Sequence, residues 1–124
     1  MFFDCFKSRI LEKVTRAEIV SLIPDAEFVQ ILDRDYFLPS DEEVLDKLGK
    51  DITIYESEKN DCDDFAFQAK GLICSNGWPF GVAFVNGSHY INVYVNDKKE
   101  FVFFEPQTRK KFDKVITKIQ SIII

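Results

Sequence analysis

The chain has 124 residues, of which 46% are hydrophobic and 30% are charged, and it contains 13 Phe. This length suits one domain with a Phe-rich core and is too short for two ordinary domains, so we predict a single domain over residues 1–124. The formal net charge of −5 argues against a protein that binds nucleic acid by neutralising phosphates, and the mixed composition excludes a disordered tail.

Three cysteines, Cys5, Cys62 and Cys74, form neither an even set nor a CxxC pair. This pattern argues against a disulfide framework and against a zinc site, and it favours the reducing cytoplasm. The apolar stretch at residues 1–6 is too short for a signal peptide, and the apolar tail at 122–124 is far below a membrane span. We therefore expect no membrane partner.

The first half of the chain predicts two helices and a strand. Apolar residues between positions 8 and 23 recur near the helical period until Pro24, which predicts a helix. Residues 26–32 predict a strand, and residues 36–39 an extended link. Ser40 and Glu43 have the spacing of a capping box, so a second helix should follow and end at Gly49.

The second half predicts a helix followed by a β-meander. A β-prone stretch at 53–55 and a polar loop at 56–61 precede a helix from Cys62 to about residue 73. Strands at 80–85, 89–95 and 101–105 are joined by Asn86-Gly87 and Asn96-Asp97 turns. Residues 109–124 permit a helix or, from Ile119, a last strand. The pattern predicts an α+β fold with N-terminal helices packed on a small antiparallel sheet.

Cys62 begins a predicted helix within a polar sequence. Unpaired N–H groups at a helix N-terminus favour a thiolate, which is the nucleophilic form of cysteine. The neighbouring Asp residues oppose this effect, because nearby negative charge raises the pKa of a thiol. Cys62 is therefore a candidate nucleophile that needs a cationic partner, and the alternative is a small buried hydrophobic residue.

His89 and Glu105 are the candidates for that partner and its support. His89 is the single histidine and opens a predicted strand, where an imidazole can take a proton near neutral pH. Glu105 ends the next strand after four apolar residues, so its carboxylate needs a partner. Adjacent strands allow the two side chains to meet, although a structural histidine and an ion pair of Glu105 with Arg109 or Lys110 are the alternatives.

Three separated motifs resemble a known family. They are Asp61-Cys62-Asp63-Asp64-Phe65-Ala66, then His89 with Asn92 three residues later, and then Phe103-Phe104-Glu105-Pro106-Gln107. They are similar to motifs of the papain-like proteolytic domain at the C-terminus of fungal chimeric agglutinins, and of its stand-alone "lectin-like" relatives in phages and prokaryotes. The segment Tyr36-Phe37-Leu38-Pro39-Ser40 also resembles those relatives, so the likeness extends over roughly the whole chain.

This resemblance implies a papain-like or transglutaminase-like thiol-hydrolase fold with a triad of Cys62, His89 and Glu105. It also implies a Ca²⁺ ion held beside the nucleophile by Asp63 and Asp64, although acidic residues in a first helical turn also compensate the helix dipole. The Gln that such enzymes commonly place ahead of the cysteine is missing. We expect support for the oxyanion or the triad from a set of amide side chains: Asn60, Asn92 and Gln107. No β-trefoil sugar-binding domain accompanies the motifs, so the resemblance does not imply lectin activity.

The main functional hypothesis is a cysteine peptidase or amidase that acts on a peptide or protein through an acyl-enzyme on Cys62. A transglutaminase-like acyl transferase on the same fold is one alternative. The other is a catalytically weak or inactive binding module, such as a phage protein that contacts a host factor.

Overall fold

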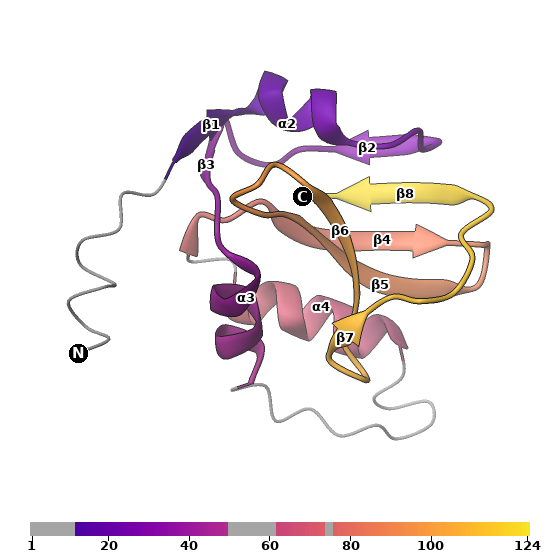
Figure 1. Cartoon of the computed structure of the whole chain (residues 1–124). Helices are drawn as coiled ribbons and strands as arrows, with labels where there is room; N and C mark the ends of the chain where they lie inside the picture. Colours follow the sequence, from indigo (N-terminus) through magenta and orange to yellow (C-terminus); the bar gives the residue numbers. More distant parts are fainter. Residues whose placement is uncertain (1–11, 50–61, 74–75) are drawn as a thin grey trace.

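The computed structural model describes residues 12–49, 62–73 and 76–124 (Figure 1). These residues form three helices, α2 (Arg16–Leu22), α3 (Asp41–Leu48) and α4 (Cys62–Ile73). Strands β1 (Lys13–Thr15) and β3 (Asp35–Phe37) pair as a two-stranded antiparallel sheet. The other strands form a six-stranded sheet: β2 (Phe28–Gln30), β8 (Ile119–Ile123), β4 (Phe80–Val85), β5 (His89–Val95), β6 (Phe101–Glu105) and β7 (Lys110–Lys111), in that order.

The mixed α+β class is confirmed, but the prediction of a purely antiparallel sheet is wrong. The edge strand β2 pairs in parallel with β8, with Phe28 opposite Ser121. The two strands come from opposite ends of the sequence, so no local pattern shows their relative direction. The strand predicted at 26–32 is present as β2, whereas β1 and β3, which also precede α3, were not predicted as strands.

The helix predicted over 8–23 is shorter in the structure. Residues 13–15 form β1, and α2 begins only at Arg16. Thr15 ends the strand in an extended conformation, and its side-chain oxygen accepts a hydrogen bond from the Glu18 N–H, which caps the helix. Val14 is buried against the core, so an apolar residue that fits a helical stripe serves a strand instead.

Several local predictions are confirmed. Ser40 and Glu43 form the capping box of α3, with both reciprocal hydrogen bonds present. Asn86 and Gly87 have φ values of 55° and 66°, as a tight hairpin turn between twisted strands requires. The bounds of β4, β5 and β6 match the predicted strands. The last strand that the sequence allowed from Ile119, as an alternative to a helix, is present as β8.

Two clusters of buried residues pack against opposite faces of the large sheet. One face is covered by α3 and α4, with Val44, Ile73 and Tyr94 among its buried residues. The other carries Ile91 and Val93 together with residues of α2, β1 and β3. Successive side chains alternate between these faces along β5, so neighbouring residues of that strand belong to different environments.

Some predictions fall on residues that the structure does not describe. They concern the stretch at 53–55, the polar loop with Asn60, and the cysteines Cys5 and Cys74. Within the described ranges, none of the helices has the length and apolar character that crossing a membrane requires.

Candidate functional site

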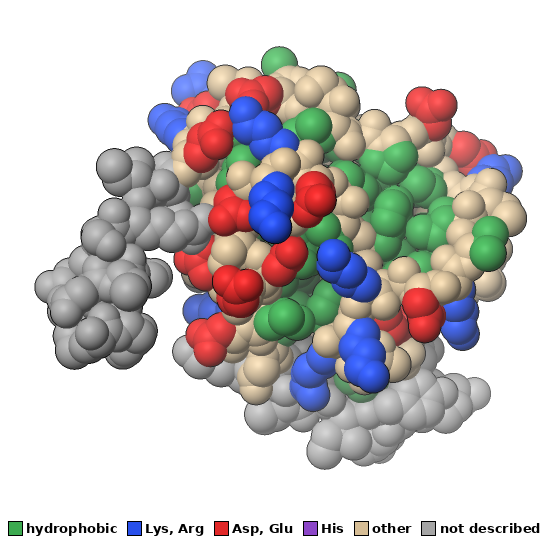
Figure 2. Space-filling model, viewed as in Figure 1, with side chains coloured by type: hydrophobic (Ala, Val, Ile, Leu, Met, Phe, Trp, Pro, Cys, Tyr) green, Lys and Arg blue, Asp and Glu red, His purple; other side chains and the backbone are tan. Residues whose placement is uncertain are grey.

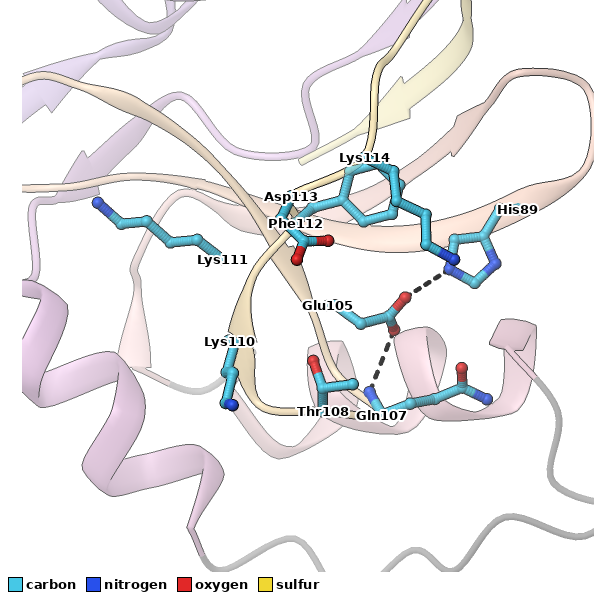
Figure 3. A pocket seen from close by; sticks show the side chains of 9 residues that line it. All are labelled: His89, Glu105, Gln107, Thr108, Lys110, Lys111, Phe112, Asp113 and Lys114. Atoms are coloured by element: carbon cyan, nitrogen blue, oxygen red, sulfur yellow. Dashed lines mark hydrogen bonds and ion pairs between the residues drawn. The ribbon is translucent and has the colours of Figure 1, made fainter.

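His89 and Glu105 are in direct contact across neighbouring strands. The Nε2 atom of His89 lies 2.5 Å from Oε1 of Glu105, where β5 begins and β6 ends. The other carboxylate oxygen of Glu105 accepts a hydrogen bond from the backbone N–H of Gln107 at 3.2 Å (Figure 3). These contacts fix the carboxylate, which in turn orients the imidazole ring. The predicted meeting of the two side chains is therefore seen in the structure, while a catalytic role for them stays a prediction.

Phe112 lies beside this pair. Its ring centroid is 5.8 Å from that of His89 with an interplanar angle of 27°, and its backbone N–H donates to the carbonyl of Phe103. Phe112 also packs partly buried against the core of that sheet face. The imidazole is thus held by a carboxylate at one edge and by an aromatic ring over its face.

A pocket of about 360 Å³ opens beside these residues. We call it the central pocket, and its lining comprises His89, Glu105, Gln107, Thr108, Lys110, Lys111, Phe112, Asp113 and Lys114 (Figure 3). The lining combines imidazole, amide, hydroxyl, ammonium and carboxylate groups with one aromatic ring. Small-ligand pockets are commonly lined mostly by apolar side chains, so this mostly polar lining suits a ligand rich in hydrogen-bonding groups.

The lysines give the central pocket an excess of positive charge. Its lining contains three lysines and two carboxylates, although the whole chain carries a net charge of −5. Lys110, Lys111 and Lys114 are exposed, and none of them forms an ion pair with another described residue. Their ammonium groups are therefore available to an anionic group of a ligand.

Cys62 lies at the same end of the sheet as His89, but the described lining of the central pocket does not include it. The Ala66 carbonyl accepts from Asn92, and Lys70 donates to the carbonyl of Phe80, which pairs with Tyr94. The helix α4 therefore runs along β5 in the same direction, and Phe67 also contacts Tyr90. These contacts place α4 on the face of Tyr90 and Asn92. Alternation along the strand directs His89 to the opposite face. Among the residues that the structure describes, no hydrogen bond joins the Cys62 thiol to His89.

Asn92 has a structural position. It is fully buried, and its side-chain nitrogen donates to the carbonyls of Ala66 and Gly81 at 2.9 and 3.0 Å. Its side-chain oxygen has no hydrogen-bond partner among the described residues. Asn92 therefore ties α4 to the sheet and lies outside the described lining of the central pocket, whereas Gln107 is part of it.

Asp63 and Asp64 lie in the first turn of α4, where carboxylates compensate the helix dipole. Within the described ranges, no group of three or more His, Cys, Asp or Glu side chains is arranged to hold a metal ion. The calcium prediction stays untested.

Sequence reasoning missed the segment that forms most of the central pocket. The sequence pattern of residues 109–124 permits a helix or a last strand and names no site there, although Lys110, Lys111 and Lys114 surround Phe112 soon after the Glu105 strand. A cluster of cations around one aromatic residue, following a buried carboxylate, was the signal available for this site.

No protein-family model matches the chain, and the curated proteins contain no match either. Solved structures do match. One, described as the PSL1a–E64 complex, is 22% identical with a TM-score of 0.68, and the match covers 90% of this chain and 51% of that chain. Another is Polyporus squamosus lectin bound to the human-type influenza-binding epitope Neu5Acα2-6Galβ1-4GlcNAc, with 22% identity, a TM-score of 0.64, and coverage of 90% and 49%.

This chain shares its fold with part of a lectin. It spans about half the length of the lectin chains that it matches, and at 22% identity the likeness concerns the fold. The comparison corrects the prediction of a papain-like proteolytic domain, because the similar structures are those of a lectin and neither is described as a peptidase. The same comparison corrects the cysteine peptidase function and the description of the chain as a hydrolase with a catalytic triad, and the binding-module alternative agrees with it better.

Proposed function

We propose that the chain is a carbohydrate-binding module whose ligand occupies the central pocket. The observation that carries this proposal is the fixed His89–Glu105 pair beneath Phe112 in a pocket lined by polar side chains. Saccharides present hydroxyl groups that both donate and accept hydrogen bonds, together with apolar ring faces. Amide, hydroxyl and imidazole groups match the hydroxyls, and an aromatic ring matches a sugar face.

The lectin comparison supports the same function. One matched lectin is bound to a sialylated trisaccharide, and the structural match covers 90% of this chain. In the proposed complex, Phe112 packs against a sugar ring. Gln107 and Thr108 then bond its hydroxyls, and Glu105 keeps the imidazole of His89 in one orientation. Calcium and a cytoplasmic location have no part in this proposal and stay predictions.

Calorimetric titration with Neu5Acα2-6Galβ1-4GlcNAc tests the proposal on the full chain. We expect saturable binding that Phe112→Ala weakens about tenfold or more, because each 1.4 kcal/mol of lost contact energy is one decade of affinity. Gln107→Ala tests the polar part of the pocket without altering the core. Phe28→Ala is the matched control, since Phe28 is 53% exposed on β2 at the opposite edge of the sheet. Equal affinities for the Phe112 and Phe28 variants, or absence of binding both to this trisaccharide and to acidic oligosaccharides, would refute the function.

A further inference from the structure

Two smaller hollows adjoin the central pocket, one on each side of Phe112. The strand-side hollow, of about 230 Å³, is lined by residues of β6 including Phe101 and Phe103, and by Lys111 and Phe112. The turn-side hollow, of about 260 Å³, is lined by Asn86, Ser88, His89, Phe112 and Lys114. Phe112 lines all three spaces, so the two hollows and the central pocket are neighbours at this ring. Together they form a row of hollows, the depression, that follows β6 from Phe101 to Glu105.

Aromatic rings run along this depression. Phe101 and Phe103 contact each other edge to face with centroids 5.2 Å apart, Phe103 is joined to Phe112 through its backbone carbonyl, and Phe112 stacks on His89. All three phenylalanines are partly buried and packed against the core, so their positions are fixed before a ligand arrives. A row of fixed rings provides successive apolar surfaces for an extended ligand.

A lysine stands at each junction between the hollows. Lys111 lines both the central pocket and the strand-side hollow, and Lys114 lines both the central pocket and the turn-side hollow. Figure 2 shows Lys or Arg side chains over the region of β7, with hydrophobic side chains visible on the same face. Two cations on either side of an aromatic centre match a ligand that carries repeated acidic groups.

The carboxylates of this surface are largely engaged already. Glu105 accepts from His89 and from the Gln107 N–H, and Glu100 accepts from the side chain of Asn96 at 2.8 Å. Asp113 is the remaining carboxylate in these linings. Glu105 and Glu100 are therefore held by partners within the fold, whereas Lys111 and Lys114 form no ion pair with another described residue.

We propose that this module binds an extended acidic oligosaccharide, with at least three sugar units lying across Phe112 and carboxylate groups at Lys111 and Lys114. This inference rests on the proposed function and adds to it the length and charge of the ligand. A single sugar fills only the central pocket, whereas the longer chain also gains contacts with Phe101 and Phe103 at one end and with Asn86 and Ser88 at the other.

Calorimetry with oligogalacturonates of one, three and five units tests the inference, with the fully methyl-esterified compounds as uncharged controls of the same length. We expect affinity to rise at least tenfold from one to three units, and the methyl esters to bind at least tenfold more weakly. Lys111→Ala and Lys114→Ala should each lower the affinity for the trimer about three- to tenfold, whereas Lys98→Ala, an exposed lysine in the β5–β6 turn, should leave it unchanged.

Phe101→Leu separates length from general binding, because Phe101 lines only the strand-side hollow among these three spaces. This variant retains an apolar side chain in the core. It should weaken binding of the five-unit acid and leave binding of the single unit unchanged. Equal affinities for all lengths, or equal affinities for acids and esters, overturn this inference about length and charge. Binding that depends on Phe112 would still support the carbohydrate-binding function in that case. If no saccharide binds in either set of titrations, both proposals are overturned.

Discussion

Gly81 faces backbone atoms at the end of β8 with no room for a Cβ atom, so replacing it by alanine should strongly destabilise the fold. A Cβ atom at this position would lie 1.9 Å from the carbonyl oxygen of Ile123 and 2.8 Å from the Cα atom of Ile124. These are backbone atoms at the end of β8, and the neighbouring pair Val82–Ile123 fixes them in the sheet. The added methyl group can be accommodated only if β4 and β8 separate at this point.

The expected magnitude follows from that geometry. Methyl groups forced into packed regions cost about 1–3 kcal/mol, and the upper end applies where backbone must move. Because alanine also lowers the entropy of the unfolded chain by up to about 1 kcal/mol, we expect Gly81→Ala to reduce the free energy of unfolding by about 2–3 kcal/mol. This is a large part of the roughly 5–15 kcal/mol that stabilises a typical domain.

Gly71→Ala is the matched control for the same chemical change. Gly71 lies in α4 near its C-terminal end, is exposed, and has nothing within 4 Å of an added Cβ. Alanine should therefore stabilise the protein by about 0.5–1 kcal/mol through its higher helix propensity. Urea unfolding followed by circular dichroism and Trp fluorescence measures both variants. If the Gly81 variant unfolds within about 0.5 kcal/mol of the parent protein with an unchanged slope, the close approach of β4 and β8 is refuted.

Three further predictions concern buried or capping polar groups. Asn92→Ala removes one hydrogen bond to Ala66 of α4 and one to Gly81 of β4, and it leaves a cavity. The free energy of unfolding in urea should therefore fall by about 2–4 kcal/mol, and a loss below about 1 kcal/mol would argue against these links. Ser40→Ala removes the N-cap of α3 and should cost about 1 kcal/mol in the same assay, and an unchanged unfolding midpoint contradicts the capping box. Burial of Tyr94 and its hydrogen bond to Asp41 raise the pKa of the phenol, so its contribution is complete below the unfolded pKa near 10 and is lost as pH rises above it. Unfolding measured from pH 8 to 11 should therefore show a falling stability that Tyr94→Phe makes less steep, and identical slopes for both proteins contradict this origin.

Much of the fold follows from short-range signals in the sequence. The capping box at Ser40, the Asn86-Gly87 turn and the alternating strands each depend on residues within a few positions of one another, and each appears in the structure where the pattern places it. The same reasoning assigned residues 13–15 to a helix, because Val14 suits both a helical stripe and a buried strand. The partner that decides between them is β3, more than twenty residues away.

Long-range pairing and the central pocket depend on information that local patterns lack. The parallel pair of β2 and β8 joins residues about ninety positions apart, and the direction of the pair follows from packing of the whole sheet. The meeting of His89 and Glu105 was predictable because the two strands form one hairpin. The pocket itself was not, because residues 107–114 show no clear period and take their positions from Glu105, Phe103 and the core.

The predicted group of Cys62, His89 and Glu105 shows what the order of residues along a chain leaves open. The order of the residues places Cys62, at the start of α4, and His89, at the start of β5, at one end of the sheet. The contacts of α4 with Tyr90 and Asn92 agree with that placement. The order does not specify the face. His89 and Glu105 share their faces of β5 and β6 with Val93 and Phe103, which pack with Phe112 in one cluster, while α4 covers the other face. A one-residue shift along β5 would exchange these environments. The face on which His89 lies is thus what joins it to Glu105 and Phe112 in the central pocket.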